Sequence, residues 1–145
     1  MWRNGMCGKI YANQYLTNMH YSAYNINVWD VESSEEYDSW FYSLDEESKT
    51  AVLERVLLLQ NFGPNLPRPY ADVLHGSCYS NLKELRNKTS EHVLRVAYYF
   101  DPKRKAFLLT GGDKKGKNQN QFYKDLIMEA EAIIAKHEKS LEEEK

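Results

Sequence analysis

The fold is decided by the stretch from residue 81 to residue 110, NLKELRNKTSEHVLRVAYYFDPKRKAFLLT. It contains three short runs with strand character: Asn81 to Arg86, His92 to Phe100, and Lys105 to Thr110. The four residues DPKR, at positions 101–104, separate the last two runs and place Asp and Pro where turns favour them. The stretch therefore predicts three antiparallel strands, the last two joined as a hairpin.

A strand and two helices are predicted ahead of this stretch. Residues Ile26 to Val31 alternate apolar and polar side chains, as a half-buried strand does. Ser33 and Glu36 have the spacing of a capping box, which predicts a short helix after them. Asp45 is placed to cap a second helix, which Gly63-Pro64 ends. The two helices form a predicted helical hairpin.

One further helix closes the chain. Apolar residues recur at helical spacing from Phe122 to His137, and a charged tail covers residues 140–145. The predicted fold class is α+β, with an antiparallel sheet packed against an N-terminal helical hairpin and a C-terminal helix. We expect one domain over residues 25–139. Residues 1–24 lack periodicity and are expected to be a disordered extension.

Composition excludes several classes of protein. Hydrophobic residues make up 42% of the 145 residues, as in a folded globular domain, and no apolar run approaches the length of a membrane span. The two cysteines form neither a disulfide framework nor a metal-ligand spacing. No nucleotide-binding loop, zinc-protease motif or serine nucleophile elbow is present. We therefore expect a cytoplasmic protein without cofactor or metal.

Charge is strongly segregated along the chain, although the formal net charge is only −2. From His75 to Lys124, eleven basic residues face four acidic ones, a net charge of +7. From Asp30 to Phe62, two basic residues face nine acidic ones, a net charge of −7. A domain polarised in this way can hold a polyanion on one face and remain soluble.

The basic residues converge on the predicted sheet. Alternation in the first strand puts Leu82, Glu84 and Arg86 on one face, with Lys83 and Leu85 on the other. In the next strand, Arg95 stands among apolar residues, where a charge is costly unless it meets a carboxylate or faces a cleft. Both possibilities remain open for Arg95, with Glu84 or Asp113 as the potential partner.

If the ligand is RNA, these residues could catalyse its cleavage. Cleavage by attack of a ribose 2′-hydroxyl needs a base for that hydroxyl, cations for the phosphorane and an acid for the leaving oxygen. Lysines and arginines can supply the charge, and a desolvated lysine can act as base. Tyr123 at the start of the last helix could stack on a base or move a proton, or it could simply pack on Ile127.

Several motifs together resemble the phage-related HigB-like toxins of the RelE/ParE superfamily. The resemblance rests on residues 68–77 (RPYADVLHGS), NLKELR at 81–86, RV at 95–96, FDPKR at 100–104, and LLTGGDK at 108–114. The resemblance covers about residues 26 to 139, and the predicted helices and strands follow in the same order as in that family. Lys115 stands where many members have threonine, and His75 lies near a position where members often have lysine.

The resemblance implies a RelE-like fold and the toxin of a type II toxin–antitoxin system. Such a toxin is a ribosome-dependent mRNA endoribonuclease that cleaves without a metal and inhibits translation. The implied partners are a cognate HigA-like helix-turn-helix antitoxin and mRNA on the ribosome, with operator DNA bound only through the antitoxin complex and no membrane partner. Two alternatives are a ParE-like gyrase inhibitor on the same fold and a non-catalytic homologue acting as corepressor.

The motif match and the charge pattern together select the candidate site residues. Arg86 and Arg95 would stabilise the phosphate and the transition state, Lys83 or Lys114 would act as base or electrostatic partner, and Tyr123 would stack or transfer a proton. Further RNA contacts are expected from Arg68, His75, Lys88, Lys115 and Lys117.

Overall fold

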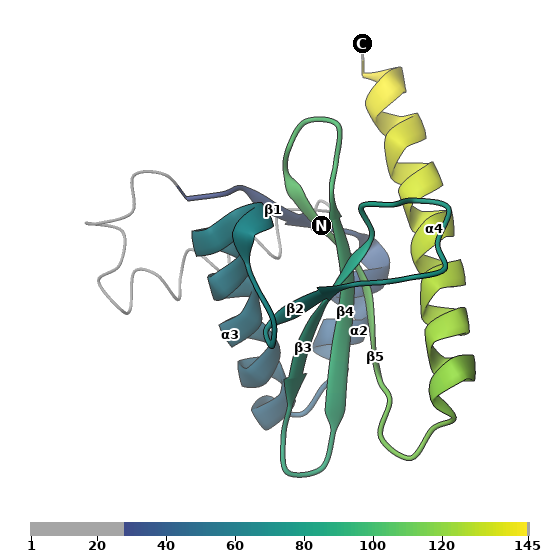
Figure 1. Cartoon of the computed structure of the whole chain (residues 1–145). Helices are drawn as coiled ribbons and strands as arrows, with labels where there is room; N and C mark the ends of the chain where they lie inside the picture. The colour runs from purple at the N-terminus through teal and green to yellow at the C-terminus, as the bar shows by residue number, and fades with distance from the viewer. Residues whose placement is uncertain (1–27, 145) are drawn as a thin grey trace.

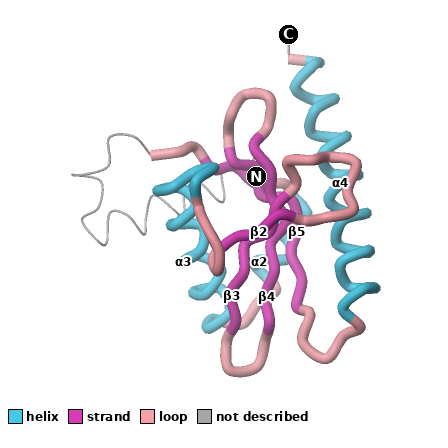
Figure 2. Tube along the Cα trace, viewed as in Figure 1, coloured by secondary structure: helices cyan, strands magenta, loops and turns pink. Residues whose placement is uncertain are grey.

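The computed structural model describes residues 28–144 and has the predicted α+β architecture (Figures 1 and 2). Its elements follow in the order β1 (Val31–Ser33), α2 (Glu35–Tyr42), α3 (Glu46–Phe62), the 3₁₀ turn η1 (Gly63–Asn65), β2 (Ala71–Val73), β3 (Lys83–Lys88), β4 (Val93–Phe100), β5 (Ala106–Asp113) and α4 (Gln119–Glu143). The extension expected over residues 1–24 lies outside the described residues.

The five strands form one sheet in the order β1-β5-β4-β3-β2. Strands β2 to β5 pair antiparallel, as predicted for the last three, but β1 pairs parallel with β5. The prediction of a purely antiparallel sheet was therefore wrong at this edge. No hairpin turn joins β1 to β5; two helices and three strands lie between them along the chain. A connection of this length allows the two strands to pair either parallel or antiparallel, so the sequence does not determine the direction. The three-residue edge strand β2 was not predicted, because alternation over three residues carries no signal.

Strand β1 and its junction with α2 differ from the predicted positions. The strand runs from Val31 to Ser33, whereas the alternation predicted residues 26–31, of which 26 and 27 lie outside the described residues. Ser34 caps α2 by accepting a hydrogen bond from the Tyr37 amide at 2.9 Å. Ser33, the predicted cap, instead ends β1 and donates to the Asp38 carboxylate at 2.6 Å. The spacing therefore placed the cap one residue too early.

The ends of α3 match the prediction. Asp45 caps the helix by accepting from the Ser48 amide at 2.7 Å. At the other end, Gly63 has a φ of +57° and lies so close to the Trp29 indole that a Cβ would stand 2.4 Å from its ring atoms. Only glycine meets both conditions, since it tolerates positive φ and has no side chain.

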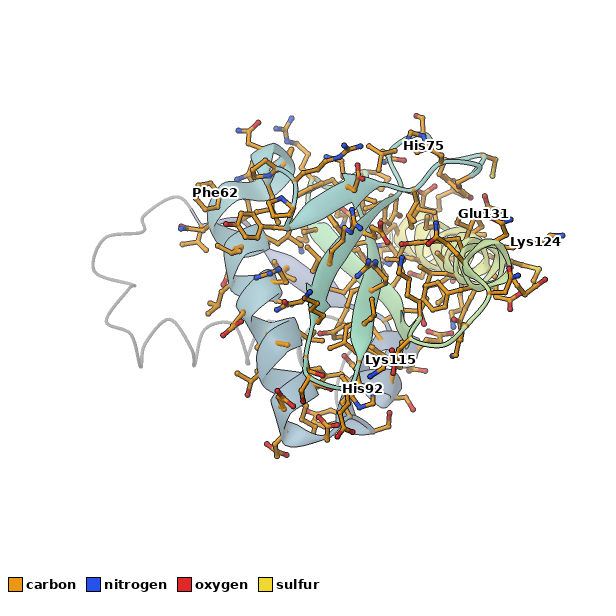
Figure 3. All side chains as sticks on the ribbon, turned by 60° about the horizontal axis from the view of Figure 1, so that its bottom comes forward. Phe62, His75, His92, Lys115, Lys124 and Glu131 are labelled. Atoms are coloured by element: carbon orange, nitrogen blue, oxygen red, sulfur yellow. The ribbon has the colours of Figure 1, made fainter. Side chains whose placement is uncertain are left out.

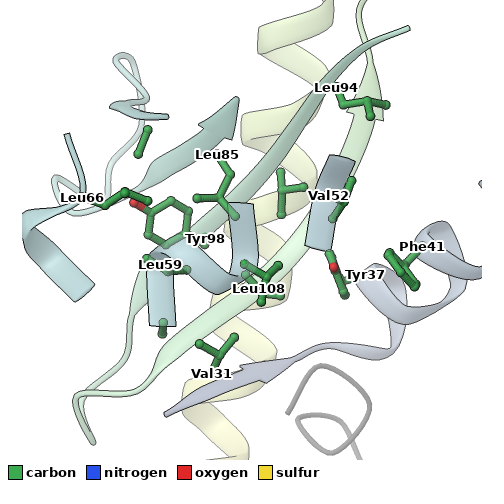
Figure 4. Packing of buried hydrophobic residues seen from close by; sticks show 14 of the residues in the cluster. Val31, Tyr37, Phe41, Val52, Leu59, Leu66, Leu85, Leu94, Tyr98 and Leu108 are labelled. Atoms are coloured by element: carbon green, nitrogen blue, oxygen red, sulfur yellow. The ribbon is translucent and has the colours of Figure 1, made fainter. Parts of the chain in front are cut away.

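Two apolar layers hold the sheet between the helices. On one face, α2 and α3 pack on strand residues that include Leu85, Val96, Tyr98 and Leu108 (Figure 4). On the other face, α4 packs on residues that include Leu82, Ala97 and Tyr99. Each large side chain buried in this way contributes about 1.5–3 kcal/mol relative to an exposed one.

Helix α4 is longer than the apolar pattern predicts. It begins after Asn118, whose side chain accepts from the Gln121 amide at 3.0 Å, and it continues through most of the charged tail to Glu143. Glutamate and lysine are good helix formers, so the tail extends the helix without an apolar face. None of the helices between residues 28 and 144 combines the length and apolar character that crossing a bilayer requires.

Candidate active site

A basic groove lies over the ends of β3 and β4. It has a volume of about 410 Å³ and is lined by Arg55, Pro69, Arg86, Asn87, Lys88, Val93 and Arg95. Four of these seven residues are cations and none is an acid. In Figure 3 the molecule is turned so that this end of the sheet comes toward the viewer, and the sheet is seen between α3 and α4. A groove of this charge attracts a polyanion such as a nucleic acid.

The strand alternation predicted for this region is confirmed. Leu82 belongs to the layer under α4, and Glu84 contacts Tyr123 of that helix, whereas Leu85 belongs to the layer under α3. Lys83 also faces away from α4, and its Nζ lies 3.4 Å from the Pro64 carbonyl. The structure therefore separates Lys83 from the other predicted catalytic residues.

Arg95 is the most buried cation of the site, with 6% of its surface exposed. Its Nε donates to the Tyr123 hydroxyl at 3.0 Å, and its Nη1 donates to the Leu94 carbonyl at 2.9 Å. The same Nε lies 3.5 Å from Glu84 Oε1. Both possibilities left open for Arg95 are realised, since it pairs with a carboxylate and also lines the groove.

Glu84 is a buried carboxylate at the centre of these cations, with 4% of its surface exposed. The Tyr123 hydroxyl donates to its Oε2 at 3.3 Å, while its Oε1 accepts no hydrogen bond. Burial raises the pKa of Glu84, although the Tyr123 hydrogen bond and the charges of Arg95, Arg86 and Lys114 oppose the shift. The carboxylate can therefore take up a proton more readily than an exposed glutamate.

Lys114 completes the cluster from the turn after β5. Its amide donates to the Val93 carbonyl at 2.8 Å, and its Nζ lies 5.2 Å from the centre of the Tyr123 ring. Burial and the charges of Arg95 and Arg86 lower the pKa of Lys114, and Glu84 only partly opposes them. A lysine in this setting gives up its proton more easily than an exposed one.

Arg86 joins the cluster to the edge of the sheet. Its Nε lies 3.8 Å from Glu84 Oε2, and its Nη1 lies 3.6 Å from Asp72 Oδ2 on β2. Asp72 also pairs with the exposed Arg68 at 3.1 Å. The predicted RNA contact Arg68 therefore reaches the site through Asp72.

The remaining predicted RNA contacts lie in different places. Lys88 is exposed and lines the groove. Lys115 and Lys117 are exposed in the turn after β5, and Lys117 lines a second cavity beside Gly112 and Phe122. Figure 3 places His75 at the opposite end of the molecule from Lys115. The structure thus brings Lys88, but not His75, to the groove.

Arg55 is a groove residue that the sequence did not single out. It extends from α3, donates from Nε to the Arg86 carbonyl at 2.7 Å and from Nη2 to Asn87 Oδ1 at 3.1 Å, and stacks over Tyr70 at 4.9 Å. The one available signal was an arginine among the apolar residues of this helix, in a segment whose other charged residues, apart from Lys49, are acidic.

Two histidines have structural partners. His92 lies between Asp113 and Asp45, with Nδ1 at 2.5 Å and Nε2 at 3.2 Å from their carboxylates. His137 stacks on Phe107 and contacts the buried Asp101 at 2.9 Å. Within residues 28–144, no group of three or more His, Cys, Asp or Glu side chains is arranged to hold a metal ion.

Residues 39–134 match the model of the family described as phage-derived protein Gp49-like. This chain belongs to the Gp49-like family. The match extends from α2 into α4 and includes every lining residue of the basic groove, together with Glu84, Lys114 and Tyr123.

Two curated relatives of this Gp49-like protein come from Mycobacterium tuberculosis (strain H37Rv). The protein named "Putative toxin HigB3" is 38% identical over 90 residues, which cover 62% of this chain and 76% of the relative. The protein named "Putative toxin HigB2" is 33% identical over 112 residues, which cover 77% of this chain and 55% of the relative. The matched part thus spans little more than half of the second relative's length. The prediction of a phage-related HigB-like family is confirmed.

Proposed function

We propose that this protein is the toxin of a toxin–antitoxin pair and acts as a ribosome-dependent mRNA endoribonuclease. The observation that carries the proposal is the cluster of Arg86, Arg95, Lys114 and Tyr123 around Glu84, of which Arg86 and Arg95 also line the basic groove. The names of the two relatives support the toxin assignment. The groove supports a nucleic acid as the ligand.

The reaction would be attack of a ribose 2′-hydroxyl on the adjacent phosphorus. The O2′–P bond forms, the P–O5′ bond breaks, and negative charge grows on the non-bridging oxygens. Arg86 and Arg95 would donate hydrogen bonds to these oxygens, because guanidinium groups match phosphate geometry and stay charged. Lys114 would protonate the leaving 5′-oxygen, a role that suits a lysine whose pKa is lowered.

The rest of the groove would bind the flanking RNA. Arg55 and Lys88 lie along the groove and can contact the neighbouring phosphates. Pro69 and Val93 form the apolar part of the groove wall. Tyr123 is half-buried, so it can present its hydroxyl or part of its ring to a nucleotide. This division gives cleavage to the cations around Glu84 and binding to the cations further along the groove.

We further propose that a cognate antitoxin of the HigA-like, helix-turn-helix type neutralises the protein and contacts operator DNA for the complex. An antitoxin that offers acidic side chains could cover the basic groove directly. The groove would then be closed to RNA as long as the antitoxin is bound.

Primer extension on cellular mRNA after induction tests the function. Expression without antitoxin should stop growth and produce discrete cuts within translated messages. Arg95→Ala should remove both effects while the protein remains folded. A folded Arg95→Ala variant with full toxicity would contradict the site assignment.

The same experiment separates the two alternatives. An SOS response with intact mRNA would indicate a gyrase inhibitor on this fold. Absence of toxicity, together with salt-dependent RNA binding that yields no cleavage products, would indicate a non-catalytic corepressor.

A further inference from the structure

The Tyr123 hydroxyl has two hydrogen-bond partners and the capacity to accept one more hydrogen bond. It accepts a hydrogen bond from Arg95 Nε at 3.0 Å and donates its own proton to Glu84 Oε2 at 3.3 Å. A hydroxyl has one proton and two lone pairs, so one lone pair remains to accept another hydrogen bond. The 2′-hydroxyl of a bound ribose is a donor that could use it.

We propose that Glu84 is the final acceptor of the 2′-hydroxyl proton, which reaches it through Tyr123. This inference rests on the proposed nuclease function and deepens it. As the 2′-oxygen attacks phosphorus, its proton passes to the Tyr123 oxygen while the Tyr123 proton passes to Glu84 Oε2. Lys114 gives a proton to the 5′-oxygen. The products are a 2′,3′-cyclic phosphate and a 5′-hydroxyl. Glu84 then releases its proton to water and Lys114 takes one up from water, which restores the site.

Glu84 is the group at this site that is best suited to accept the proton. The charged and titratable groups facing it are Arg86 on its own strand, Arg95 on β4, Lys114 after β5 and Tyr123 on α4. Arginines stay protonated, and Lys114 is needed as the acid. Burial raises the pKa of Glu84, which makes it a stronger base than an ordinary glutamate once it is ionised.

Asp72 is a weaker candidate, although it also contacts Arg86. Burial alone would raise the pKa of Asp72, but hydrogen bonds from the Val73 amide and Arg68 and the charges of Arg68 and Arg86 leave that pKa lowered. Asp72 is therefore a poor proton acceptor. No hydrogen bond joins it to Tyr123 among the described residues.

Proton arrival at Glu84 also changes the electrostatics of the site. An ionised Glu84 neutralises part of the charge of Arg95 and Arg86, which lie 3.5 and 3.8 Å away. Once Glu84 is protonated, Arg95 faces the phosphorane without a competing carboxylate, and Arg86 keeps only its 3.6 Å contact with Asp72. The positive field of the site therefore rises as negative charge develops on the phosphate.

Single-turnover cleavage of a 5′-labelled mRNA bound to ribosomes tests the relay, with the rate constant measured from pH 5 to 9. The wild-type rate should rise with pH as Glu84 ionises. Glu84→Gln keeps a hydrogen-bond acceptor but cannot take the proton. Glu84→Gln should lower the rate constant by roughly 10²–10⁴-fold and abolish the rise of the rate constant with pH, called here the rising limb of the pH profile. The protein concentration giving half the maximal rate should change little, because Glu84 does not touch the phosphate.

Tyr123→Phe breaks the relay while keeping the contact between Glu84 and Arg95. It should also abolish the rising limb, and the double variant should be no slower than the slower single variant, since the two groups act as a unit. The matched control is Glu138→Gln, because Glu138 accepts from the Tyr99 hydroxyl at 3.0 Å outside the groove. This control should cleave like wild type.

The outcomes separate the relay from the nuclease itself. A folded Glu84→Gln variant that cleaves within about threefold of wild type and keeps the rising limb would overturn the relay. Circular dichroism shows whether Glu84→Gln folds. If it does not, a Tyr123→Phe variant whose rate constant rises with pH as in wild type would overturn the relay instead. If the wild-type protein cuts no mRNA at any pH, the proposed function itself fails.

Discussion

Arg86 and Arg95 stand directly opposite each other on the neighbouring antiparallel strands β3 and β4. Two like charges in this position repel and normally destabilise a sheet. Glu84 compensates, because its two carboxylate oxygens lie 3.8 Å from Arg86 and 3.5 Å from Arg95. The sheet thus keeps two arginines together at the floor of a groove, an arrangement that suits phosphate binding better than folding.

We expect Arg86→Ala to impair activity without impairing stability. One third of the Arg86 side chain is exposed and both of its carboxylate contacts are long, so its removal should change the free energy of unfolding by less than about 1 kcal/mol. Cleavage should fall by roughly 10²-fold or more, since a donor to the transition state is lost. Urea unfolding and primer extension measure the two quantities.

The control for Arg86 is Lys103→Ala. Lys103 is an exposed cation at the hairpin between β4 and β5, paired with Glu144 at 3.4 Å and remote from the groove. The Lys103→Ala variant should retain full toxicity. Equal losses of cleavage in the two variants would mean that net charge, and not the position of Arg86, governs activity.

Arg95→Ala should cost stability as well as activity. It leaves the buried Glu84 without its closest cation, and breaking a buried pair in this way costs roughly 3 kcal/mol. The loss should become smaller as pH falls and Glu84 takes up a proton, and smaller again in Arg95→Ala/Glu84→Gln. Urea unfolding of wild type, both single variants and the double variant gives the coupling free energy. A coupling near zero would show that the pair contributes nothing to stability.

Much of the fold could be predicted because its signals are local. Helix α3 has a capping aspartate, an apolar stripe and a terminating glycine, and the hairpin at residues 101–104 has a turn sequence between two apolar runs. The direction of β1 and the presence of β2 depend on pairing between distant segments. Nothing in a three-residue run specifies such pairing.

The site was predictable where it depends on strand alternation, and not where it depends on tertiary packing. Alternation placed Glu84 and Arg86 on one face and Lys83 on the other, but the sequence alone did not show that this separates Lys83 from the site. Arg55 enters the groove because α3 packs beside the end of β3. The link from Tyr123 to Glu84 likewise requires the angle at which α4 crosses the sheet.

His92 should make stability depend on pH. Its hydrogen bond to Asp113, and then the charges of Asp113 and Asp45, raise the pKa of His92. A raised pKa in the folded state stabilises the protein fully below the unfolded value of about 6.5, and this contribution disappears as pH rises through the folded value. The free energy of unfolding should therefore fall from about pH 6.5 upward.

His92→Gln should remove this slope, as measured by urea unfolding at several pH values. His75→Gln is the matched control, because His75 is an exposed histidine in a turn. It should leave the slope as in wild type. A wild-type slope in His92→Gln would assign the effect to another group.

Gly111→Ala should destabilise the sheet. A Cβ at Gly111 would stand 2.4 Å from the Trp40 ring, and a ring packed between α2 and β5 cannot yield easily. We expect a loss of about 1–3 kcal/mol in thermal or urea unfolding. Gly112→Ala is the milder comparison, since its Cβ would stand 3.0 Å from Phe122. Adding Trp40→Leu should recover part of the Gly111→Ala loss, and no recovery would contradict the steric explanation.

Lys114→Arg should separate charge from proton transfer in the proposed reaction. The lowered pKa of Lys114 lets it serve as acid near neutral pH, whereas an arginine keeps its proton throughout this range. The variant should bind RNA with wild-type salt dependence, because the charge is unchanged. Its single-turnover rate should be at least tenfold lower. The decline expected of the wild-type rate at high pH, where Lys114 loses its proton, should be absent from the variant. Lys115→Arg, one residue further along the exposed turn, should behave like wild type. A Lys114→Arg variant with the wild-type rate and the same decline would leave Lys114 a purely electrostatic role.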